Sequence, residues 1–429
     1  MAGIYIHIPF CKSRCAYCDF YSTTLGGERE NYVRALCSEI VERRGEMRGS
    51  RVRSIYIGGG TPSVLATAQL RRILDCVYKN YEVEEDAEVT MEMNPDDVVI
   101  DDVVIAIINH QSSINRISLG IQTFDDALLR LIRRRHDAQT AVEAVRRLQE
   151  VGISNISIDL IYGLPGQTLE MWERDLDTAF SLDVQHLSAY ALSYEEGTAL
   201  ARWRAEGRVE EVPEDVQVQM YERLCERTRA AGFEHYEISN FALPGYHSRH
   251  NSSYWTGAAY LGFGPGAHSY DGARTRRANK PDLTAYREGV ESLKFKVESL
   301  KAEVRGLMAG GRGLKAEGRG SRAEGRGLMA EGRGLRAEGR GSRAEEWFTT
   351  EVLTDDELYD EAVMCGLRTA HGVQLEAIER RFGLQRLDYL LQQAAPHLRA
   401  GRLAQTDGRL HLTVRSLMVS DDIMSDLMA

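Results

Sequence analysis

Short apolar runs alternate with longer amphipathic segments along the first 195 or so residues of the chain. The runs are rich in β-branched and aromatic residues, which is typical of buried strands. They are GIYIHI, SIYIG, EVTMEM, RISLGI, ISIDLIYG and HLSAYAL. The segments between them have helical periodicity, as in AQLRRILDCVYKNY, DALLRLIRRR and QTAVEAVRRLQEVG. Repeated strand-then-helix units form a parallel sheet or barrel, and six strands predict a partial, open (β/α)6 barrel of the α/β class over residues 1–213.

Two further parts follow the predicted barrel. Residues 214–290 contain one clear helix, EDVQVQMYERLCERTRAAG, and then strings dense in glycine, histidine and aromatic residues, so we assign them to an extension of the barrel. Residues 347–429 contain helices such as DDELYDEAVMCGLRTA and end in GRLAQTDGRLHLT, where Asp407 and Gly408 predict a hairpin turn. Helices closed by a hairpin predict a small C-terminal α+β domain that resembles a winged helix.

A seven-residue repeat dominates the segment between these parts, residues 291–346. The units GRGLKAE, GRGSRAE, GRGLMAE, GRGLRAE and GRGSRAE follow one another from Gly311 to Glu345. Two glycines per unit cost about 1 kcal/mol each in a helix, and only one position per unit is a large aliphatic residue. The repeat therefore predicts a flexible low-complexity insertion rather than a coiled coil. Its basic charge would also suit a tether that binds nucleic acid. A solvated surface loop is the more common case, and the repeat lacks the aromatic residues that stack on bases.

Three of the cysteines crowd into the string CKSRCAYC: Cys11, Cys15 and Cys18. This spacing suits three thiolates that hold three corners of a [4Fe-4S] cube and leave the fourth iron without a protein ligand. A zinc site is the alternative, but zinc usually takes further ligands from a second pair, and the chain has no second cysteine pair. The loop follows the first predicted strand, and the next strand runs into Gly58–Pro62, so both are expected at the mouth of the barrel.

The other cysteines and the overall charge bear on the compartment and the partners. Cys37, Cys76, Cys225 and Cys365 are scattered in helix-like or apolar stretches, where we expect buried free thiols and no disulfide framework. The first residues lack a cationic start with a cleavable apolar stretch, and no later run reaches the roughly 18 apolar residues of a membrane-spanning helix. We therefore expect a cytoplasmic protein. The net charge of −11 predicts no nucleic-acid partner.

The cysteine loop and the glycine turn together resemble the radical S-adenosylmethionine superfamily. Within it, YIHIPFC, IYIGGGTPS, EMNP, GIQTF, IDLIYGLPGQT and GFGPGAHS resemble, in order, strings of the oxygen-independent coproporphyrinogen III oxidase group. The resemblance implies that the three cysteines bind a [4Fe-4S] cluster whose open iron binds S-adenosylmethionine. It also implies contacts to S-adenosylmethionine from Tyr5, Tyr17, Gly59, Gly60, Thr61, Glu92, Gln122, Arg134, Asp159 and Ala191.

The chemistry of these residue types agrees with that implication. A carboxylate such as Glu92 can accept from an ammonium group, Arg134 can bind a carboxylate, and Asp159 can bind ribose hydroxyls. We expect the pocket residues from Glu92 onward to lie at or just past strand ends. A helix cap or a surface ion pair is the alternative for any single carboxylate.

One substitution and one downstream string separate the chain from the oxidases. Their cysteine motif continues with a fourth cysteine two positions on, where this chain has Phe20. The string HNSSYW, residues 250–255, resembles the HNxxYW motif of the HemW family of heme chaperones, which implies heme as a ligand. Because a neutral imidazole can ligate heme iron, His250 is the candidate iron ligand, with His247 and His268 as rivals. The alternative is a loop histidine held by hydrogen bonds beside two core aromatic residues.

These features lead to three hypotheses of function. In the first, which we favour, the protein is a heme chaperone that contains the cluster and S-adenosylmethionine. It binds heme and transfers it to heme-accepting respiratory proteins at the membrane surface, and a homodimer is compatible with this role. In the second, it is an oxygen-independent coproporphyrinogen III oxidase that decarboxylates propionates in heme biosynthesis, an activity that Phe20 argues against. In the third, a radical enzyme acts on RNA through the basic repeat.

Overall fold

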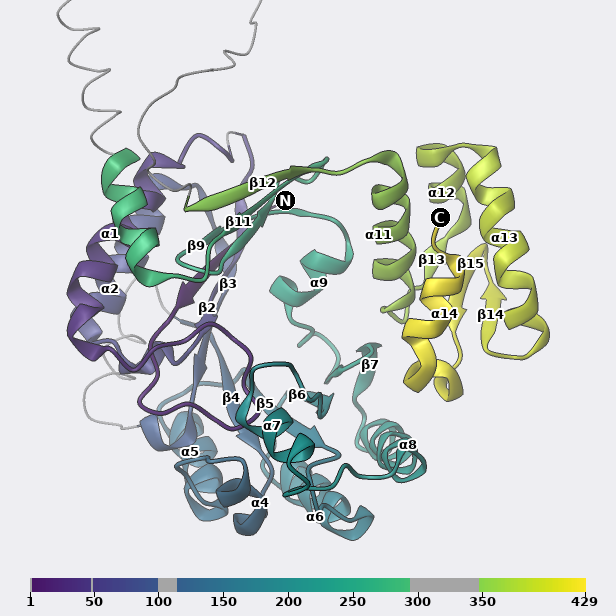
Figure 1. Ribbon diagram of the computed structural model, residues 1–429, viewed down its shortest axis with the longest axis horizontal. Coiled ribbons are helices and arrows are strands. Elements are labelled where there is room, and N and C mark those ends of the chain that lie inside the picture. Colours follow the sequence, from purple (N-terminus) through teal and green to yellow (C-terminus); the bar gives the residue numbers. More distant parts are fainter. Residues whose placement is uncertain (1, 48, 99–113, 294–346) are drawn as a thin grey trace, which may run out of the picture.

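The computed structural model describes residues 2–47, 49–98, 114–293 and 347–429 (Figure 1). The predicted insertion at 291–346, with its repeat, lies outside these residues apart from its first three positions. All six predicted strands form. They are β1 (Ala2–Ile8), β2 (Val52–Gly59), β3 (Val83–Met93), β4 (Arg116–Gln122), β5 (Ile156–Tyr162) and β6 (His186–Ala191). They pair in parallel in this order, which confirms the partial barrel.

Helices follow the strands as the amphipathic segments predicted. They are α1 (Arg29–Glu42), α2 (Thr67–Asn80), α4 (Asp126–Leu131), α5 (Ala138–Glu150), α6 (Leu169–Ser181), α7 (Ala199–Ala205) and α8 (Glu214–Ala230). Helix α4 is shorter than the pattern DALLRLIRRR indicates, because Arg133 adopts a left-handed φ of 60°. This early end places Arg134 on a turn, where its backbone N–H donates to the Leu129 carbonyl at 2.8 Å.

The sheet continues beyond the six parallel strands at both edges. The added elements are β7 (Glu234–Glu237), β8 (Asn240–Ala242), β9 (Ala259–Phe263), β10 (His268–Tyr270), β11 (Thr275–Asn279) and β12 (Phe348–Val352). Strand β9 pairs in parallel with β1, and β8 pairs antiparallel with β6, so β1 to β12 form one twelve-stranded sheet. The segment before β9 forms the helix α9 (Arg249–Trp255) instead of a loop.

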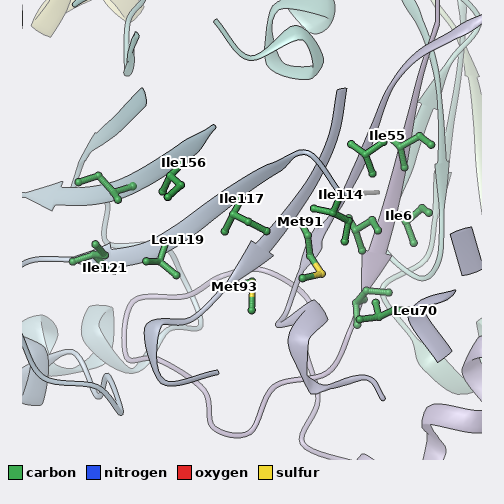
Figure 2. Packing of buried hydrophobic residues seen from close by; sticks show 14 of the residues in the cluster. Ile6, Ile55, Leu70, Met91, Met93, Ile114, Ile117, Leu119, Ile121 and Ile156 are labelled. Carbon is green, nitrogen blue, oxygen red and sulfur yellow. The ribbon is translucent and has the colours of Figure 1, made fainter. Parts of the chain in front are cut away.

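Apolar side chains from neighbouring strands form the main core (Figure 2). Ile6, Ile55, Met91 and Ile117, one from each of β1 to β4, are all at most 2% exposed. Leu70 of α2 belongs to the same cluster and has no exposed surface. Because a parallel sheet buries its strands, this core explains the almost continuous apolar runs in the sequence.

The C-terminal part has its own apolar core. Its elements are α11 (Asp355–Leu367), β13 (Val373–Gln374), α12 (Leu375–Phe382), α13 (Leu384–Arg399), β14 (Leu403–Thr406), β15 (Arg409–Leu412) and α14 (Ser420–Leu427). The predicted hairpin is present: Asp407 and Gly408, with φ of 49° and 70°, connect β14 to β15. Both positive φ angles suit the two-residue turn expected from an Asp-Gly pair. Within the described ranges, no helix combines the length and the apolar character that crossing a membrane requires.

Candidate functional site

A cavity of about 430 Å³ opens at the carboxyl ends of the parallel strands. The predicted cluster and S-adenosylmethionine residues that line it are Cys11, Cys15, Tyr17, Cys18, Gly59, Gly60, Thr61, Glu92, Gln122, Arg134, Asp159 and Ala191. These residues are far apart in the sequence, and they converge because parallel strands end at the same edge of the barrel. We call this space the barrel cavity.

Backbone hydrogen bonds fix the cysteine loop to the rest of the barrel. The Cys11 N–H donates to the Thr23 carbonyl at 2.9 Å, which closes the loop at its base. In its middle, the Ala16 N–H donates to the carbonyl of Ile132 at 3.0 Å, and the Leu200 N–H donates to the carbonyl of Ala16 at 2.8 Å. The loop that holds the three thiols is therefore anchored by α4 and by the start of α7.

The glycine turn after β2 lies directly against this loop. The Gly60 and Thr61 N–H groups donate to the carbonyls of Ile8 and Phe10, at 2.8 and 2.7 Å. A Cβ on Gly60 would lie 2.8 and 2.7 Å from the same two carbonyl oxygens, a distance that backbone atoms cannot accommodate without shifting. Gly59 has a φ of 103°, which favours glycine. The absence of side chains here keeps one wall of the cavity open to a ligand.

Arg134 connects the cysteine loop to the neighbouring strands. Its Nη1 donates to Cys15 Sγ at 3.4 Å, and its Nη2 donates to Asn94 Oδ1 at 2.6 Å. Asn94 Nδ2 in turn donates to Thr61 Oγ1 at 3.1 Å, and the Thr61 hydroxyl donates to Cys11 Sγ at 3.5 Å. Arg134 Nε is buried and has no hydrogen-bond partner in the described part of the chain. The Nε–H of the guanidinium thus remains for an acceptor such as a carboxylate.

Glu92 and Asp159 are the predicted carboxyl groups in the cavity wall. Glu92 accepts from the Tyr56 hydroxyl at 2.7 Å and from the Gly59 N–H at 3.0 Å, and burial raises the pKa of its carboxyl to about 7. Asp159 accepts from Ser118 Oγ at 3.2 Å, and burial raises the pKa of its carboxyl to about 6. A cation that entered the cavity, such as an ammonium group, would favour the ionised form of both carboxyls.

The strand positions of the pocket residues agree with expectation except at Arg134, which lies on the turn after α4, and at Asp159. Gln122 and Ala191 are the last residues of β4 and β6, and Glu92 is the last but one of β3. Asp159 is the fourth of seven residues in β5 and not at its end, and it is the only residue of that strand that is not fully buried. Its side chain reaches the cavity because it points to the inner face of the barrel. Gln122 has a φ of 75°, in the left-handed region where non-glycine residues are strained.

The donor set fits a [4Fe-4S] cluster better than a single metal ion. Cys11, Cys15 and Cys18 line one wall of the cavity, and each has a partly exposed, free thiol. In residues 2–47, 49–98, 114–293 and 347–429, no group of three histidine, cysteine or acidic side chains is arranged to hold one metal ion. Three thiolates that each bind a different iron of a cube do not need to converge on one point.

Tyr5 lies behind the cavity wall rather than in it. Its hydroxyl is 2.9 Å from His7 Nδ1, and its ring centroid is 6.2 Å from that of Tyr56, which does line the cavity. A direct contact of Tyr5 with S-adenosylmethionine is therefore not visible in the geometry and stays a prediction. In this arrangement Tyr5 supports Tyr56 from the interior.

His250, the candidate heme ligand, is buried next to the same aromatic residues, with 1% of its surface exposed. Its ring stacks on Tyr56 with a centroid distance of 5.1 Å. Its Nδ1 is 2.9 Å from Ser54 Oγ, and its Nε2 is 2.9 Å from the Tyr254 hydroxyl. Burial lowers the pKa of the imidazole to about 3, so the ring is neutral. Ligation of iron by His250 requires that one of these two hydrogen bonds be exchanged for the metal.

The rival histidines and Phe20 are all more exposed than His250. His247 is half-exposed, with its Nε2 2.7 Å from a carboxylate oxygen of Glu234. His268 is the first residue of β10 and is exposed. Phe20, at the position where the oxidases continue their cysteine motif, is 62% exposed at the edge of the barrel cavity.

Several residues of the cavity wall were missed by the sequence analysis. Asn94 belongs to the same EMNP string as Glu92, so the string itself contained the signal. Tyr56 lies in IYIGGGTPS and directs its hydroxyl to Glu92. His186 lines the wall with its Nδ1 2.7 Å from Ser157 Oγ and its Nε2 2.8 Å from the Tyr236 hydroxyl. No sequence string pointed to His186, because its partners come from separate strands.

Known protein families match both parts of the chain. The model of the radical SAM superfamily matches residues 5–179, and that of the HemN C-terminal domain matches residues 353–419. The heme chaperone HemW of Bacillus subtilis (strain 168) is 39% identical over 288 residues, which cover 67% of this chain and 75% of that protein. HemW of Escherichia coli (strain K12) is 37% identical over 270 residues, covering 62% and 69%.

The solved structures add a likeness in fold. Coproporphyrinogen III oxidase (HemN) from Escherichia coli, described as a radical SAM enzyme, aligns with a TM-score of 0.76 at 21% sequence identity. The alignment covers 100% of this chain and 90% of that chain. At this identity the likeness concerns the shared fold, namely the barrel and the C-terminal domain.

Proposed function

This chain belongs to the HemW family of heme chaperones, and we propose that it binds heme and transfers it to other proteins. The observation that supports the proposal most directly is the string HNSSYW on α9, next to the barrel cavity. Its His250 has a neutral imidazole whose ring centroid is 5.1 Å from that of Tyr254, and Trp255 follows Tyr254 in the same helix. Imidazole nitrogen is a common ligand of heme iron, and aromatic rings offer flat apolar surface to a macrocycle.

We propose His250 as the iron ligand. Its neutral state at physiological pH keeps a ring nitrogen available for a metal, since a protonated imidazole cannot ligate. Ligation through Nε2 would exchange the hydrogen bond to the Tyr254 hydroxyl for the iron. The Nδ1 contact with Ser54 Oγ would then orient the ring, as outer hydrogen bonds do for metal-binding histidines.

We further propose that the barrel cavity holds a [4Fe-4S] cluster on Cys11, Cys15 and Cys18, together with S-adenosylmethionine. A cluster at this site would supply one-electron chemistry and an iron without a protein ligand. The residues of the chain bind and orient: Arg134 has a free donor for a carboxylate, and the buried carboxyl of Glu92 suits an ammonium group. The contacts of Thr61 and Arg134 with cysteine sulfur would stabilise negative charge on the thiolates.

Respiratory heme proteins are the proposed acceptors, reached at the membrane surface from a cytoplasmic location. A homodimer remains part of the proposal. The acceptors, the location and the homodimer follow from the family resemblance, and heme binding can be tested without them.

The test is an anaerobic titration of the cluster-reconstituted protein with ferric heme, followed by the Soret absorption. We expect saturable heme binding by the wild type and a loss of affinity of about tenfold or more in His250→Ala, because the iron loses its protein ligand. His268→Ala, which removes an exposed histidine, is the matched control and should bind as the wild type does. A wild type without a Soret change would refute heme binding, and an unchanged His250→Ala would refute the ligand.

Oxidative decarboxylation of coproporphyrinogen III is the second candidate, and the shared fold with the solved oxidase favours it. Phe20 argues against it, since the oxidases have a cysteine at that position. Anaerobic incubation with coproporphyrinogen III, S-adenosylmethionine and a reductant separates the two. We expect no protoporphyrinogen; its formation would reject a function limited to heme transfer.

A further inference from the structure

A second cleft, of about 400 Å³, lies between the barrel and the C-terminal domain. One wall consists of residues from α9 and β9 to β11, and the other consists of residues from α11, β13 and α12. In Figure 1, α9 lies between the sheet and α11. We call this space the interdomain cleft. Its volume falls within the roughly 300–1,000 Å³ that are usual for small-molecule sites.

Aromatic side chains form much of its lining. Trp255, Tyr260 and Tyr270 come from the barrel side, and Phe382 comes from the C-terminal domain. The Tyr260 and Tyr270 ring centroids are 6.5 Å apart, so these rings form a continuous surface rather than isolated contacts. Such a lining suits a flat, largely apolar ligand.

Two arginines complete the lining. Arg276 donates from Nη2 to Glu361 at 2.6 Å, but its Nε is buried and has no hydrogen-bond partner in the described part of the chain. Arg381 is exposed at the rim, with its guanidinium 5.0 Å from the centroid of Phe382. Trp255 Nε1 is a further buried donor without a partner there. Glu361 also lines the cleft, so two guanidinium groups face one carboxylate there, and this excess of positive charge favours a ligand with carboxylates.

The side chain of Tyr254 separates the cleft from His250, the proposed iron ligand. Tyr254 lines the cleft, and its hydroxyl is 2.9 Å from His250 Nε2. A small displacement of this hydroxyl would open His250 towards the cleft. The other neighbour of His250, Tyr56, lines the barrel cavity, so the histidine lies between the two spaces.

We propose that the interdomain cleft is the binding site of the heme, with the macrocycle against the aromatic lining and the two propionates on Arg276 and Arg381. This inference rests on the proposed function, because it assigns the place of the ligand named there. It predicts that heme contacts the C-terminal domain as well as the HNSSYW segment.

A thiol in the cleft allows a direct test. Cys365 of α11 lines the cleft and is half-buried, whereas Cys37 of α1 is half-buried and lies outside it. The full-length, cluster-reconstituted protein is alkylated with and without ferric heme, and labelled peptides are quantified by mass spectrometry. With free heme at ten times its Kd, we expect Cys365 to react about tenfold more slowly and Cys37 to react as before. Equal rates for Cys365 with and without bound heme would overturn the proposal.

Neighbouring arginines of α12 provide a matched pair of variants for the propionate contact. Arg381 lines the cleft, and Arg380, also exposed, does not. We expect Arg381→Glu to weaken heme binding about five- to tenfold and Arg380→Glu to leave it unchanged. Heme dimethyl ester lacks the propionate charges, so Arg381→Glu should not weaken its binding. Equal heme affinities of the two variants would overturn the assignment of Arg381.

The experiments separate failure of heme binding from failure of the cleft as its site. A wild type that binds no heme would refute the proposed function and the cleft together. A wild type that binds heme, without protection of Cys365 and with equal affinities of the two arginine variants, would refute the cleft alone.

Discussion

Glu92 shows how a single residue prepares the barrel cavity for a charged ligand. Burial raises the pKa of its carboxyl from the ordinary 4.5 to about 7, so the folded protein binds this proton more tightly than the unfolded chain does. The free energy of unfolding of the cluster-free protein should therefore fall as the pH rises from about 4.5 to 7 and remain low above that. Binding of a cationic ligand would remove this penalty.

Glu92→Gln tests this account. The amide has no charge to bury, so we expect the variant without cluster to unfold at pH 8 with a free energy about 1–3 kcal/mol higher than that of the wild type. At pH 5 the difference should largely disappear, because Glu92 is then protonated in the folded state. Urea unfolding at the two pH values measures both effects. Glu150→Gln, at the exposed end of α5, is the control and should keep the pH dependence of the wild type. An unfolding free energy of Glu92→Gln that depends on pH as that of the wild type does would contradict the prediction.

At this scale, the sequence predicted positions better than it predicted side-chain directions. Residues at or just past strand ends, such as Gly60 and Gln122, were expected in the site, because parallel strands end together. The strings could not show that Tyr5 points into the interior behind Tyr56, since direction depends on how the sheet curves. The sequence also could not predict that His250 is buried between Ser54 and Tyr254, because this burial depends on how α9 packs on β2.

Among the elements, α1 is held to the extension of the sheet by one buried carboxylate. Glu39 has no exposed side-chain surface and pairs with Arg43 Nη1 at 2.9 Å. It also accepts from the Gly264 N–H at 3.0 Å, from Asn279 Nδ2 at 3.0 Å and from the Tyr286 hydroxyl at 2.7 Å. These partners lie on and after β9 and β11, so Glu39 joins segments separated by more than 200 residues. It thereby stabilises the pairing of β9 with β1.

Removal of this carboxylate should destabilise the protein strongly. Glu39→Ala leaves three donors without this acceptor and leaves the buried Arg43 with Glu46 as its remaining carboxylate partner, so we expect a loss of about 3–5 kcal/mol in the free energy of unfolding. Glu42→Ala, on the same helix, should cost less than about 0.5 kcal/mol. Chemical denaturation with a fluorescence readout compares the two. Similar losses in both variants would show that Glu39 has no special role.

The alternation of apolar and amphipathic segments predicted the elements β1 to β6 because each strand and its following helix are local in sequence. The same patterns gave no sign that β9 pairs in parallel with β1. That pairing depends on contacts across the whole barrel, such as the one between Glu39 and Gly264, and no local property of AYLGF distinguishes it from an antiparallel strand.

For the whole molecule, the ends of the repeat-containing segment meet in one place. The helix at residues 283–293 precedes it, and Trp347 follows it. A Cβ on Gly289 would lie 1.9 Å from Trp347 Cδ1, so the indole packs directly on this glycine. The Tyr286 and Trp347 rings are 5.4 Å apart, and the Lys280 N–H donates to the Trp347 carbonyl at 2.8 Å. The chain therefore leaves and re-enters the domain at a junction that is already packed.

This geometry predicts that removal of residues 311–345 leaves the folded domain and heme binding intact. The deletion shortens the connection between residues 293 and 347 about threefold, which lowers the entropy cost of closing it by about 1 kcal/mol. We expect Tm to rise by no more than about 2–4 °C. Trp347→Ala in the full-length chain should lower Tm instead, because it empties the junction. A fall in Tm or in heme affinity on deletion would show that the repeat contacts the domain, and an unchanged affinity would remove the reason to assign the repeat an RNA ligand.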